Sequence, residues 1–435
     1  MESNHILKIK KRNQPEWLIW FILIFPFLFG TIFNFLALPS FLKYTLDIAW
    51  LLLLVLLVKN SKLIARNKAN VVLFWFIIVF LLYTLILYTF HYQSFAYYLW
   101  GTRNNFRFYI FFFACIVFLK RKDIDDYFVL FDILFWINFI VSAIQFFAFD
   151  LKGDFLGGIF GNEKGCNSYT NILLLIVLIK SVIYYLNRRE SIWSCTAKCI
   201  VMMLIAVGAE LKFFYIELLI VIISAILLTS FSWKKVAIIL IGASAVLIGM
   251  LLFSIVFPNI LNHLSIQSLL ETATSDKGYT GDGDLNRLTT IPIISNSFLT
   301  TTMEKLFGLG LGNCDTSTFS FLQTPFHLSY SYLNYTWFST AFVFLELGYT
   351  GLLFFFGFFA LIFFLSRKVA RTSGPDKIYC HIASILAICC VLIAIYNASL
   401  RTEAGYMAYF VLALPFVGGT KHQEDVSLNV SQDTI

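Results

Sequence analysis

The chain has 435 residues, of which 59% are hydrophobic and only 13% are charged. Soluble domains carry roughly 25% charged residues, so this composition excludes an ordinary water-soluble enzyme or binding module. The net charge of +7 would suggest a nucleic-acid partner in a soluble protein. In a membrane protein, basic residues on cytosolic loops explain this positive charge. We therefore expect no nucleic-acid partner.

Apolar runs long enough to cross a bilayer as helices recur along the whole sequence. A helix needs about 20 apolar residues to cross roughly 30 Å of hydrocarbon, and continuous runs exclude the alternating pattern of a closed barrel. The sequence predicts twelve spans, the first retained rather than cleaved, at 17–38, 41–58, 71–90, 106–119, 127–149, 169–186, 195–209, 213–230, 236–257, 337–365, 379–396 and 406–418. We expect an all-α polytopic membrane protein with one transmembrane domain over 1–420 and a disordered cytosolic tail at 421–435.

Lysine and arginine gather in every second short loop, which predicts the orientation of the chain. These clusters lie at 8–12, 59–68, 120–122, 188–189, 234–235 and 367–377. Both termini are therefore expected in the cytosol. Lys180 and Lys198 lie near the cytosolic ends of their spans, and we expect them to extend to the interface.

The predicted outer side collects three polar segments. They are the loop after the third span, with Arg103 and Arg107, the glycine-rich loop 150–167, and a large extracytoplasmic loop at 258–336. Two short outer turns, Glu210-Leu-Lys212 and 397–403, add further charges. The chain has eight cysteines, mostly inside spans. Only Cys166 and Cys314 fall in loops on the same predicted side, and the sequence leaves open whether they form a disulfide.

Five predicted outer-face cations lie at junctions of spans and loops, where a charge must be solvated, paired or bound to a ligand. They are Arg103 (or Arg107), Lys164, Lys212, Arg287 and Arg401. Interfacial solvation or pairing with Glu163, Glu210, Asp284 and Glu403 accounts for any single one. Together they suit an anionic headgroup, and arginine binds phosphate bidentately. The natural ligand is a lipid-linked diphosphate.

The sequence predicts no metal and no cofactor. Asp282 and Asp284 form an Asp-Gly-Asp motif deep in the polar segment, where a turn is the preferred interpretation. The glycine run 308–312 lacks the strand-turn-helix context of a phosphate loop, so it is expected to allow a re-entrant turn or close helix contact. The aromatic residues near 97–100 and 330–337 fit an interfacial belt or sugar stacking.

One ordered set of motifs resembles the O-antigen ligase and polymerase (Wzy-type) superfamily. Arg287 is followed by a helical stretch, then by Leu306-Phe-Gly-Leu-Gly-Leu-Gly-Asn313, and then by Phe344-Leu-Glu-Leu-Gly-Tyr-Thr-Gly351 at the head of a long apolar span. The Gly-Asn-Glu-Lys-Gly sequence at 161–165 and Glu210-Leu-Lys212 support the resemblance more loosely.

The resemblance implies a GT-C-like fold and metal-independent glycosyl transfer at the outer face of the bacterial cytoplasmic membrane. The donor and acceptor would be undecaprenyl-diphosphate-linked glycans, surrounded by membrane lipid, and a chain-length regulator would be a partner. The product would be a surface polysaccharide such as O-antigen, capsule or exopolysaccharide. The leaving diphosphate needs fixed cations, and the acceptor hydroxyl needs a base.

The residues at the position of the ligase base differ from the ligase pattern. Ligases carry a His-Asn pair eleven residues before the glycine that matches Gly348. Here Trp337 and Phe338 occupy those positions. This favours a repeat-unit polymerase, with ligase-type transfer to another acceptor and a twelve-span transporter or flippase as alternatives. We expect an outer carboxylate, Glu163 or Glu210, to act as the base, with a displaced His327 as the alternative.

Overall fold

The computed structural model describes residues 13–28, 30, 36, 39–91, 93–230, 232–257, 283–287, 289–372, 374 and 377–418. Within these residues the secondary structure is helical, with no strand. The main helices are α1 (Gln14–Leu28), α2 (Thr45–Lys59), α3 (Lys68–His91), α4 (Phe95–Phe118), α5 (Ile124–Ala148), α6 (Asn167–Leu186), α7 (Ile192–Gly208), α8 (Lys212–Leu228), α9 (Lys234–Val256), α11 (Thr290–Ser297), α12 (Thr302–Phe307), α13 (Pro325–Tyr330), α14 (Ser339–Thr372), α15 (Lys377–Tyr396) and α16 (Gly405–Ala413).

The all-α prediction is confirmed for the described residues, and the chain is a polytopic helical membrane protein. Seven helical segments in this part of the chain are long and apolar enough to cross a bilayer, and they include α2, α3, α5, α6, α9, α14 and α15. The helices α1, α7 and α16 belong to shorter apolar segments. Each of the twelve predicted spans overlaps a helix, although the number of crossings stays a prediction.

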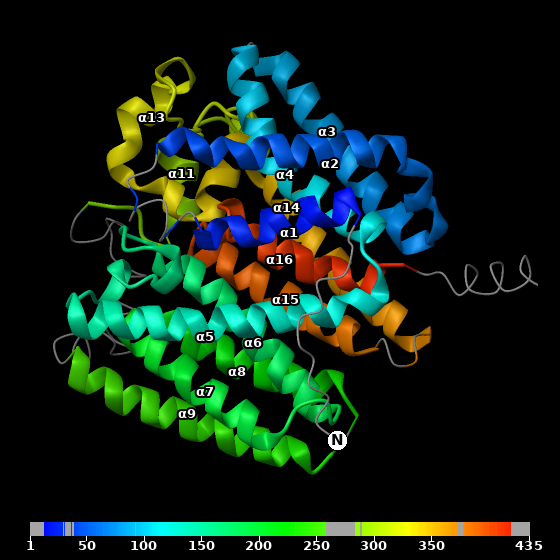
Figure 1. Cartoon of the computed structure of the whole chain (residues 1–435). Helices are drawn as coiled ribbons and strands as arrows, with labels where there is room; N and C mark the ends of the chain where they lie inside the picture. Colours follow the sequence, from blue (N-terminus) through cyan, green and yellow to red (C-terminus); the bar gives the residue numbers. More distant parts are fainter. Residues whose placement is uncertain are drawn as a thin grey trace, which may run out of the picture.

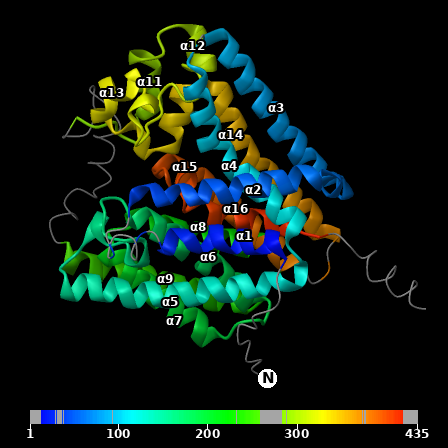
Figure 2. The same cartoon turned by 45° about the horizontal axis from the view of Figure 1, so that its top comes forward.

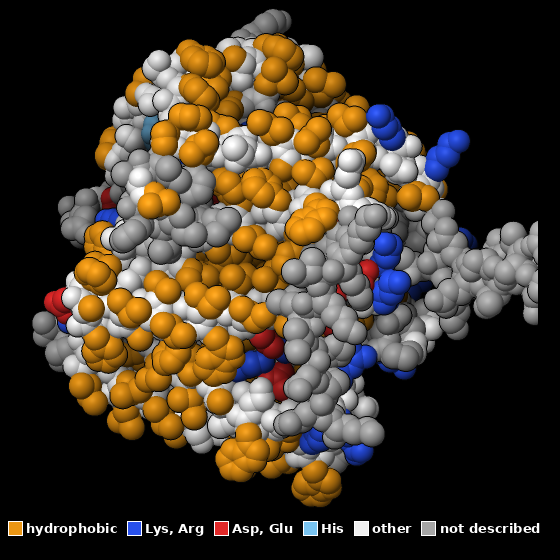
Figure 3. Space-filling view, viewed as in Figure 1, with side chains coloured by type: hydrophobic (Ala, Val, Ile, Leu, Met, Phe, Trp, Pro, Cys, Tyr) orange, Lys and Arg blue, Asp and Glu red, His pale blue; other side chains and the backbone are white. Residues whose placement is uncertain are grey.

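The helix α6 lies inside the bundle and organises the packing around it. It packs against α5, α7, α8, α15 and α16, and nearly all of its side chains are buried, Lys180 included. Most of these helices run side by side (Figure 1). Apolar side chains cover much of the outer surface seen in Figure 3, as expected where lipid replaces water.

Basic loops meet at one end of the bundle. Lys120 pairs with Glu16 at 3.0 Å, Arg121 donates to the Leu414 carbonyl at 2.7 Å, and Lys234 reaches the Tyr185 carbonyl at 3.0 Å. Lysine and arginine side chains gather at the same edge of the molecule in Figure 3. The loops predicted to be cytosolic therefore share one end, while the side of the membrane they face stays a prediction.

The predicted loop after the third span is wrong, because α4 already begins at Phe95. Arg103 and Arg107 are therefore helical residues. Polar side chains made this stretch look like a loop, but both guanidinium groups are paired inside the protein. Arg103 binds Asp47 with two bonds of 2.8 and 2.6 Å, and Arg107 pairs with Glu403 at 3.3 Å.

Lys180 and Lys198 lie in buried ion pairs rather than extending into solvent. Both ammonium groups are buried and bind Asp132, at 2.6 and 2.9 Å, and Lys198 also pairs with Glu190 at 2.9 Å. Carboxylates on α5 and on the α6–α7 turn offset the cost of burying the lysines, and the network ties three helices together.

Residues 283–287 and 289–336 form a cap at the end of the bundle away from the basic loops. Its three short helices, α11, α12 and α13, lie together near the ends of α3 and α14 (Figure 2). Two helices separated by a turn, α11 and α12, replace the single helical stretch expected between Arg287 and Leu306. Residues 258–282 of the predicted loop, Asp282 among them, lie outside the described residues.

A break in α14 at Gly348 attaches the cap. Gly348 has φ of 62°, a left-handed conformation that glycine adopts without steric cost. The break frees backbone carbonyls, and the cap uses two of them: Leu309 N donates to Leu345 O at 2.8 Å, and Gly310 N donates to Glu346 O at 2.9 Å. A Cβ on Gly308 would lie 2.3 Å from the backbone of Glu346. The close contact expected of the glycine run is confirmed.

Candidate functional site

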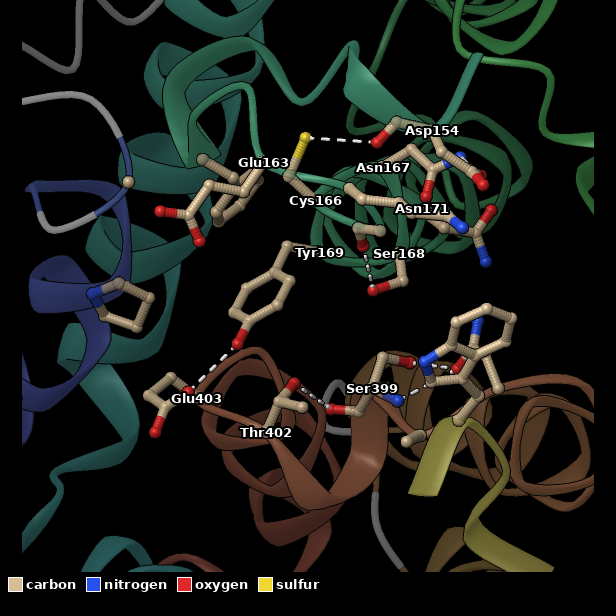
Figure 4. Close-up of a pocket in the computed structure, with 18 of the residues that line it drawn as sticks. Asp154, Glu163, Cys166, Asn167, Ser168, Tyr169, Asn171, Ser399, Thr402 and Glu403 are labelled. Carbon is tan, nitrogen blue, oxygen red and sulfur yellow. Dashed lines mark hydrogen bonds between the residues drawn. The ribbon is translucent and has the colours of Figure 1, made fainter. Parts of the chain in front are cut away.

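A cavity of about 590 Å³ opens between the N-terminal end of α6, the α7–α8 turn, the α15–α16 turn and the end of α1. Figure 4 shows part of its wall. Its charged lining residues are Lys43, Asp154, Glu163, Lys164, Glu210, Arg287 and Glu403. Its aromatic lining residues include Phe160, Tyr169, Phe213, Trp337 and Tyr396. The size is typical of a pocket for a small molecule or a headgroup.

The glycine-rich loop 150–166 is held in place by buried amide side chains of α5. Gln145 donates from Nε2 to the Gly158 carbonyl at 3.0 Å and accepts the Gly158 N–H at 2.7 Å. Gly158 has φ of 60°, and a Cβ there would lie 2.2 Å from Asn138 Oδ1. This anchoring carries Glu163 and Lys164 to the cavity at the start of α6.

The N-terminus of α6 adds positive character to the same wall. Cys166 at the N-cap position gives no side-chain hydrogen bond to the helix. Ser168 N and Tyr169 N donate to the Gly165 and Cys166 carbonyls, both at 3.1 Å, so the wall gains the positive end of the helix dipole rather than free amide groups. Lys164 lies just before it, with its ammonium 5.0 Å from the Trp337 ring. No ion pair to Lys164 is found within the described part of the chain.

Arg287 is a second cation of the lining, and Tyr396 contacts it in two ways. Its Nε donates to the Tyr396 carbonyl at 3.0 Å, and its guanidinium lies 4.4 Å from the Tyr396 ring. Tyr396 in turn stacks on Phe213 at 4.4 Å, with the ring planes 9° apart. Among residues that the structure describes, no carboxylate pairs with Arg287, so its terminal N–H groups are available to an anionic ligand.

The carboxylates of the lining differ in their partners. Glu210 occupies the tight α7–α8 turn with φ of 54° and pairs with Lys212 at 2.8 Å. A side chain at positive φ is unusual and is often found at functional sites. Glu163 also faces the cavity. The two residues predicted as candidate bases are thus part of one site.

Glu403 is a further lining carboxylate, which the sequence suggested only as an ion-pair partner. It accepts a hydrogen bond from the Tyr169 hydroxyl at 2.9 Å, drawn in Figure 4, and pairs with the buried Arg107. Burial opposes its charge, but Arg107 and Tyr169 outweigh burial and hold the pKa of Glu403 below its ordinary value.

The five predicted cations do not all reach this cavity. Lys164 and Arg287 line the cavity. Lys212 is not part of the lining but forms an ion pair with the lining residue Glu210. Arg103 is outside the lining, bound to Asp47. Arg401 is half-buried, with its guanidinium 3.5 Å from the Phe342 ring, and loss of solvent lowers its pKa despite nearby carboxylates.

His327 belongs to the cap rather than to the cavity lining. Its Nδ1 lies 3.1 Å from the Tyr335 hydroxyl, which donates to the Cys314 carbonyl at 2.6 Å. Burial lowers the pKa of His327. Cys314 and Cys166 are both free thiols, so the disulfide left open by the sequence is absent.

Asn171 is one of several lining residues that the sequence analysis missed. It lies inside an apolar span, where a single asparagine carries little signal. The available clue was its spacing of four residues from Asn167, which puts both amides on one face of a helix. Tyr169 was also missed, because a tyrosine near the end of a span is typical of the membrane interface. No set of three or more His, Cys, Asp or Glu side chains suited to a metal is found in the described residues.

The arrangement combines fixed positive charge, carboxylates and aromatic faces in one water-accessible pocket. Such a pocket can hold an anionic group and a polar ring at the same time. Comparison with models of protein families, with curated proteins and with solved structures finds no match to this chain.

Proposed function

We propose that the chain is a polymerase of undecaprenyl-diphosphate-linked repeat units, acting at the outer face of a bacterial cytoplasmic membrane without a metal ion. The observation that carries this proposal is the cavity wall at the start of α6. There, Lys164, Arg287 and the first turn of α6, at the positive end of its dipole, line one space. These are the groups that bind a diphosphate.

The proposed reaction is a displacement at the anomeric carbon of the donor glycan. The acceptor hydroxyl loses its proton to Glu163 or Glu210, and its oxygen forms the new bond to that carbon. The bond from the carbon to the diphosphate oxygen breaks, and the electron pair leaves with the diphosphate. Lys164 and Arg287 stabilise the charge that develops there.

Aromatic and polar lining residues favour a sugar beside the diphosphate. The cavity includes the rings of Phe160, Tyr169 and Trp337, which offer apolar faces to a pyranose. This second feature supports a glycan substrate over a bare lipid phosphate. Ligase-type transfer would use the same donor site and differ in the acceptor.

The proposal is tested with purified protein in lipid nanodiscs and undecaprenyl diphosphate as the probe. Charge-assisted hydrogen bonds are worth about 1.5–3 kcal/mol each, so Lys164→Ala and Arg287→Ala should each weaken binding by roughly tenfold to a hundredfold. Arg287→Lys should restore only part of the loss, because lysine lacks the fork of donors.

Lys152→Ala is the matched control, because this lysine lies on the same loop as Lys164 but pairs with the exposed Asp150 and is not part of the cavity lining. It should bind undecaprenyl diphosphate like the parent. Equal losses in all variants, or none, would reject the diphosphate site. Polymer made in cells by the alanine variants at normal expression would reject the polymerase assignment.

A further inference from the structure

The turn that ends α7 has a geometry that usually belongs to glycine. Glu210 N donates to the Val207 carbonyl at 3.1 Å, and Leu211 N donates to the Ala206 carbonyl at 2.8 Å. This pair of bonds is the Schellman motif, in which one residue takes a left-handed conformation and is most often glycine. Here that residue is Glu210, with φ of 54°, and it lines the cavity.

A side chain at this position is unfavourable for the turn itself. In the left-handed conformation a Cβ is crowded by the carbonyl that follows it, whereas glycine has no Cβ to crowd. Replacing Glu210 by glycine would therefore relieve the backbone. The reason for a glutamate here must be sought in what its carboxylate contacts.

The carboxylate of Glu210 stands at the cavity wall with one oxygen left over. Its Oε1 lies 2.8 Å from Lys212 Nζ, and its side chain keeps 27% of its surface exposed. Within the described part of the chain, Oε2 has no hydrogen-bond partner, and it is not a buried atom. A Cβ on Gly153 would lie 2.9 Å from Oε2. Because Gly153 has no side chain, the glycine-rich loop packs beside this oxygen without covering it.

Two neighbours fix the place of this carboxylate relative to the cations. Asn167 Nδ2 donates to the Ala209 carbonyl at 3.0 Å, which ties the start of α6 to the turn directly before Glu210. Tyr396, whose ring lies 4.4 Å from the Arg287 guanidinium, also interacts electrostatically with Glu210. The carboxylate and the cation are therefore neighbours of the same aromatic side chain.

Glu163 stands on a different kind of backbone. It lies in the exposed stretch 162–164 of the glycine-rich loop, rather than in a tight turn between two helices. A catalytic group must be held to within about 0.5 Å of its productive position. The locked turn at Glu210 meets this requirement better than the exposed loop.

We infer that Glu210, rather than Glu163, is the catalytic base, and that the turn keeps a side chain at a glycine position because the reaction needs the base there. The inference rests on the proposed function and decides between its two candidate bases. The proton of the acceptor hydroxyl passes to Glu210 Oε2, and the oxygen bonds to the anomeric carbon. The diphosphate leaves with the electron pair of the broken bond.

The test separates the stability of each variant from its activity. Polymer is measured in cells of the source organism whose own copy is replaced by the variant. Thermal unfolding and binding of undecaprenyl diphosphate are measured on purified protein in nanodiscs.

Glu210→Gly should lose activity without losing stability. It should unfold at the parent's temperature or about 1 °C above it, because the left-handed position is relieved. It should bind undecaprenyl diphosphate at least as tightly as the parent, because a negative charge is removed. It should make at least about a hundredfold less polymer, since general-base catalysis contributes about 10²–10⁴-fold.

Arg188→Gly is the matched control. The α6–α7 turn has the same motif, with bonds from Arg188 N to the Tyr185 carbonyl at 3.1 Å and from Arg189 N to the Tyr184 carbonyl at 2.8 Å. Arg188 has φ of 62° but is not part of the cavity lining. This variant should show the same small change in unfolding temperature and make as much polymer as the parent.

Two amide variants distinguish the candidate bases. Glu210→Gln keeps the size of the side chain and should lose polymer as Glu210→Gly does. Glu163→Gln should lose less than tenfold, because Glu163 lines the cavity without taking the proton.

Four results would overturn the inference. They are parental polymer from either Glu210 variant, a larger loss from Glu163→Gln than from Glu210→Gln, an equal loss from Arg188→Gly, and a lower unfolding temperature for Glu210→Gly. The proposed function stands in each of these cases as long as the parent binds undecaprenyl diphosphate. If the parent does not bind it, the proposed function is wrong and the inference falls with it.

Discussion

At the scale of single residues, the Arg107–Glu403 pair shows how a partner keeps a carboxylate charged in an apolar setting. The side chain of Arg107 is almost fully buried, whereas that of Glu403 keeps 32% of its surface exposed. Removing the carboxylate would leave the guanidinium buried with much weaker partners. Such losses cost about 3–5 kcal/mol in fully buried pairs, and partial exposure reduces the figure.

We therefore expect Glu403→Gln to lower the unfolding temperature of the detergent-solubilised protein by several degrees at neutral pH. Because the pKa of Glu403 is lowered in the folded protein, its stabilising effect is present above the ordinary value and is lost as pH falls through the lowered one. The parent should lose stability in acid, and the variant should lose less.

Thermal unfolding measured between pH 3 and 7 checks this, with Asp150→Asn as the control. Asp150 also pairs with a cation, Lys152, but its side chain is 85% exposed, so little change is expected. Parallel pH profiles for parent and Glu403→Gln would show that the pair does not contribute.

At the scale of elements, the broken helix α14 joins the cap to the membrane helices. Besides the two bonds from the cap, the Tyr83 hydroxyl donates to the Leu347 carbonyl at 2.9 Å. Three consecutive carbonyls next to Gly348 are thus satisfied from α3 and the cap. In an apolar setting, an unsatisfied carbonyl would cost several kcal/mol.

Gly348→Ala should release the cap. A Cβ at this position would lie 2.4 Å from the Leu306 backbone, and φ is positive, so we expect destabilisation of more than about 2 kcal/mol. Limited proteolysis of the cap checks this. Gly357→Ala, in the same helix but facing only the Phe76 side chain at 3.2 Å, is the control and should stay resistant.

The sequence predicts the long apolar helices well, but it does not predict where polar helices begin or where a helix breaks. Long apolar runs locate α3, α6 and α15 well, because lipid and the buried core both demand apolar side chains. The start of α4 was missed because Thr102-Arg-Asn-Asn105 interrupts the apolar sequence, and the Asp47 partner of Arg103 lies far away in the chain. The sequence motif around Gly348 was recognised. The break that Gly348 makes in α14 was not predicted, because it depends on contacts with residues about forty positions earlier in the chain.

The cavity was predictable only in part. Charges at the ends of spans indicated Glu163, Lys164, Glu210 and Arg287, all of which line it. The same pattern also pointed to Arg103, Arg401 and His327, which pack elsewhere. Sequence alone cannot tell a cation held by a distant carboxylate from one left available to a ligand.

At the scale of the whole molecule, the two ends of the bundle differ in character. Basic loops gather at one end, and the cap and the cavity occupy the other. All eight cysteines are buried, so the chain should react little with impermeant thiol reagents. This allows the orientation in the membrane to be measured directly.

We expect a cysteine introduced at Ser320 in the cap to react from outside intact cells, whereas one at Lys62 in the α2–α3 turn should react only after the membrane is opened. Both side chains are exposed, so access depends on sidedness alone. The opposite pattern would place the cavity in the cytosol and exclude transfer from an outer-leaflet donor.

The attachment of the cap also dictates an order of assembly. A ribosome makes Leu309 and Gly310 before the carbonyls of Leu345 and Glu346 that receive their N–H groups. The start of α14 is bonded in turn to Asn397, from Ser339 N at 3.2 Å and Ser339 Oγ at 3.0 Å. The cap therefore cannot form its bonds to α14 until α14 itself has been synthesised. The lining of the cavity is complete only after Glu403 has emerged, so a nascent chain has no complete cavity until the α15–α16 turn is made.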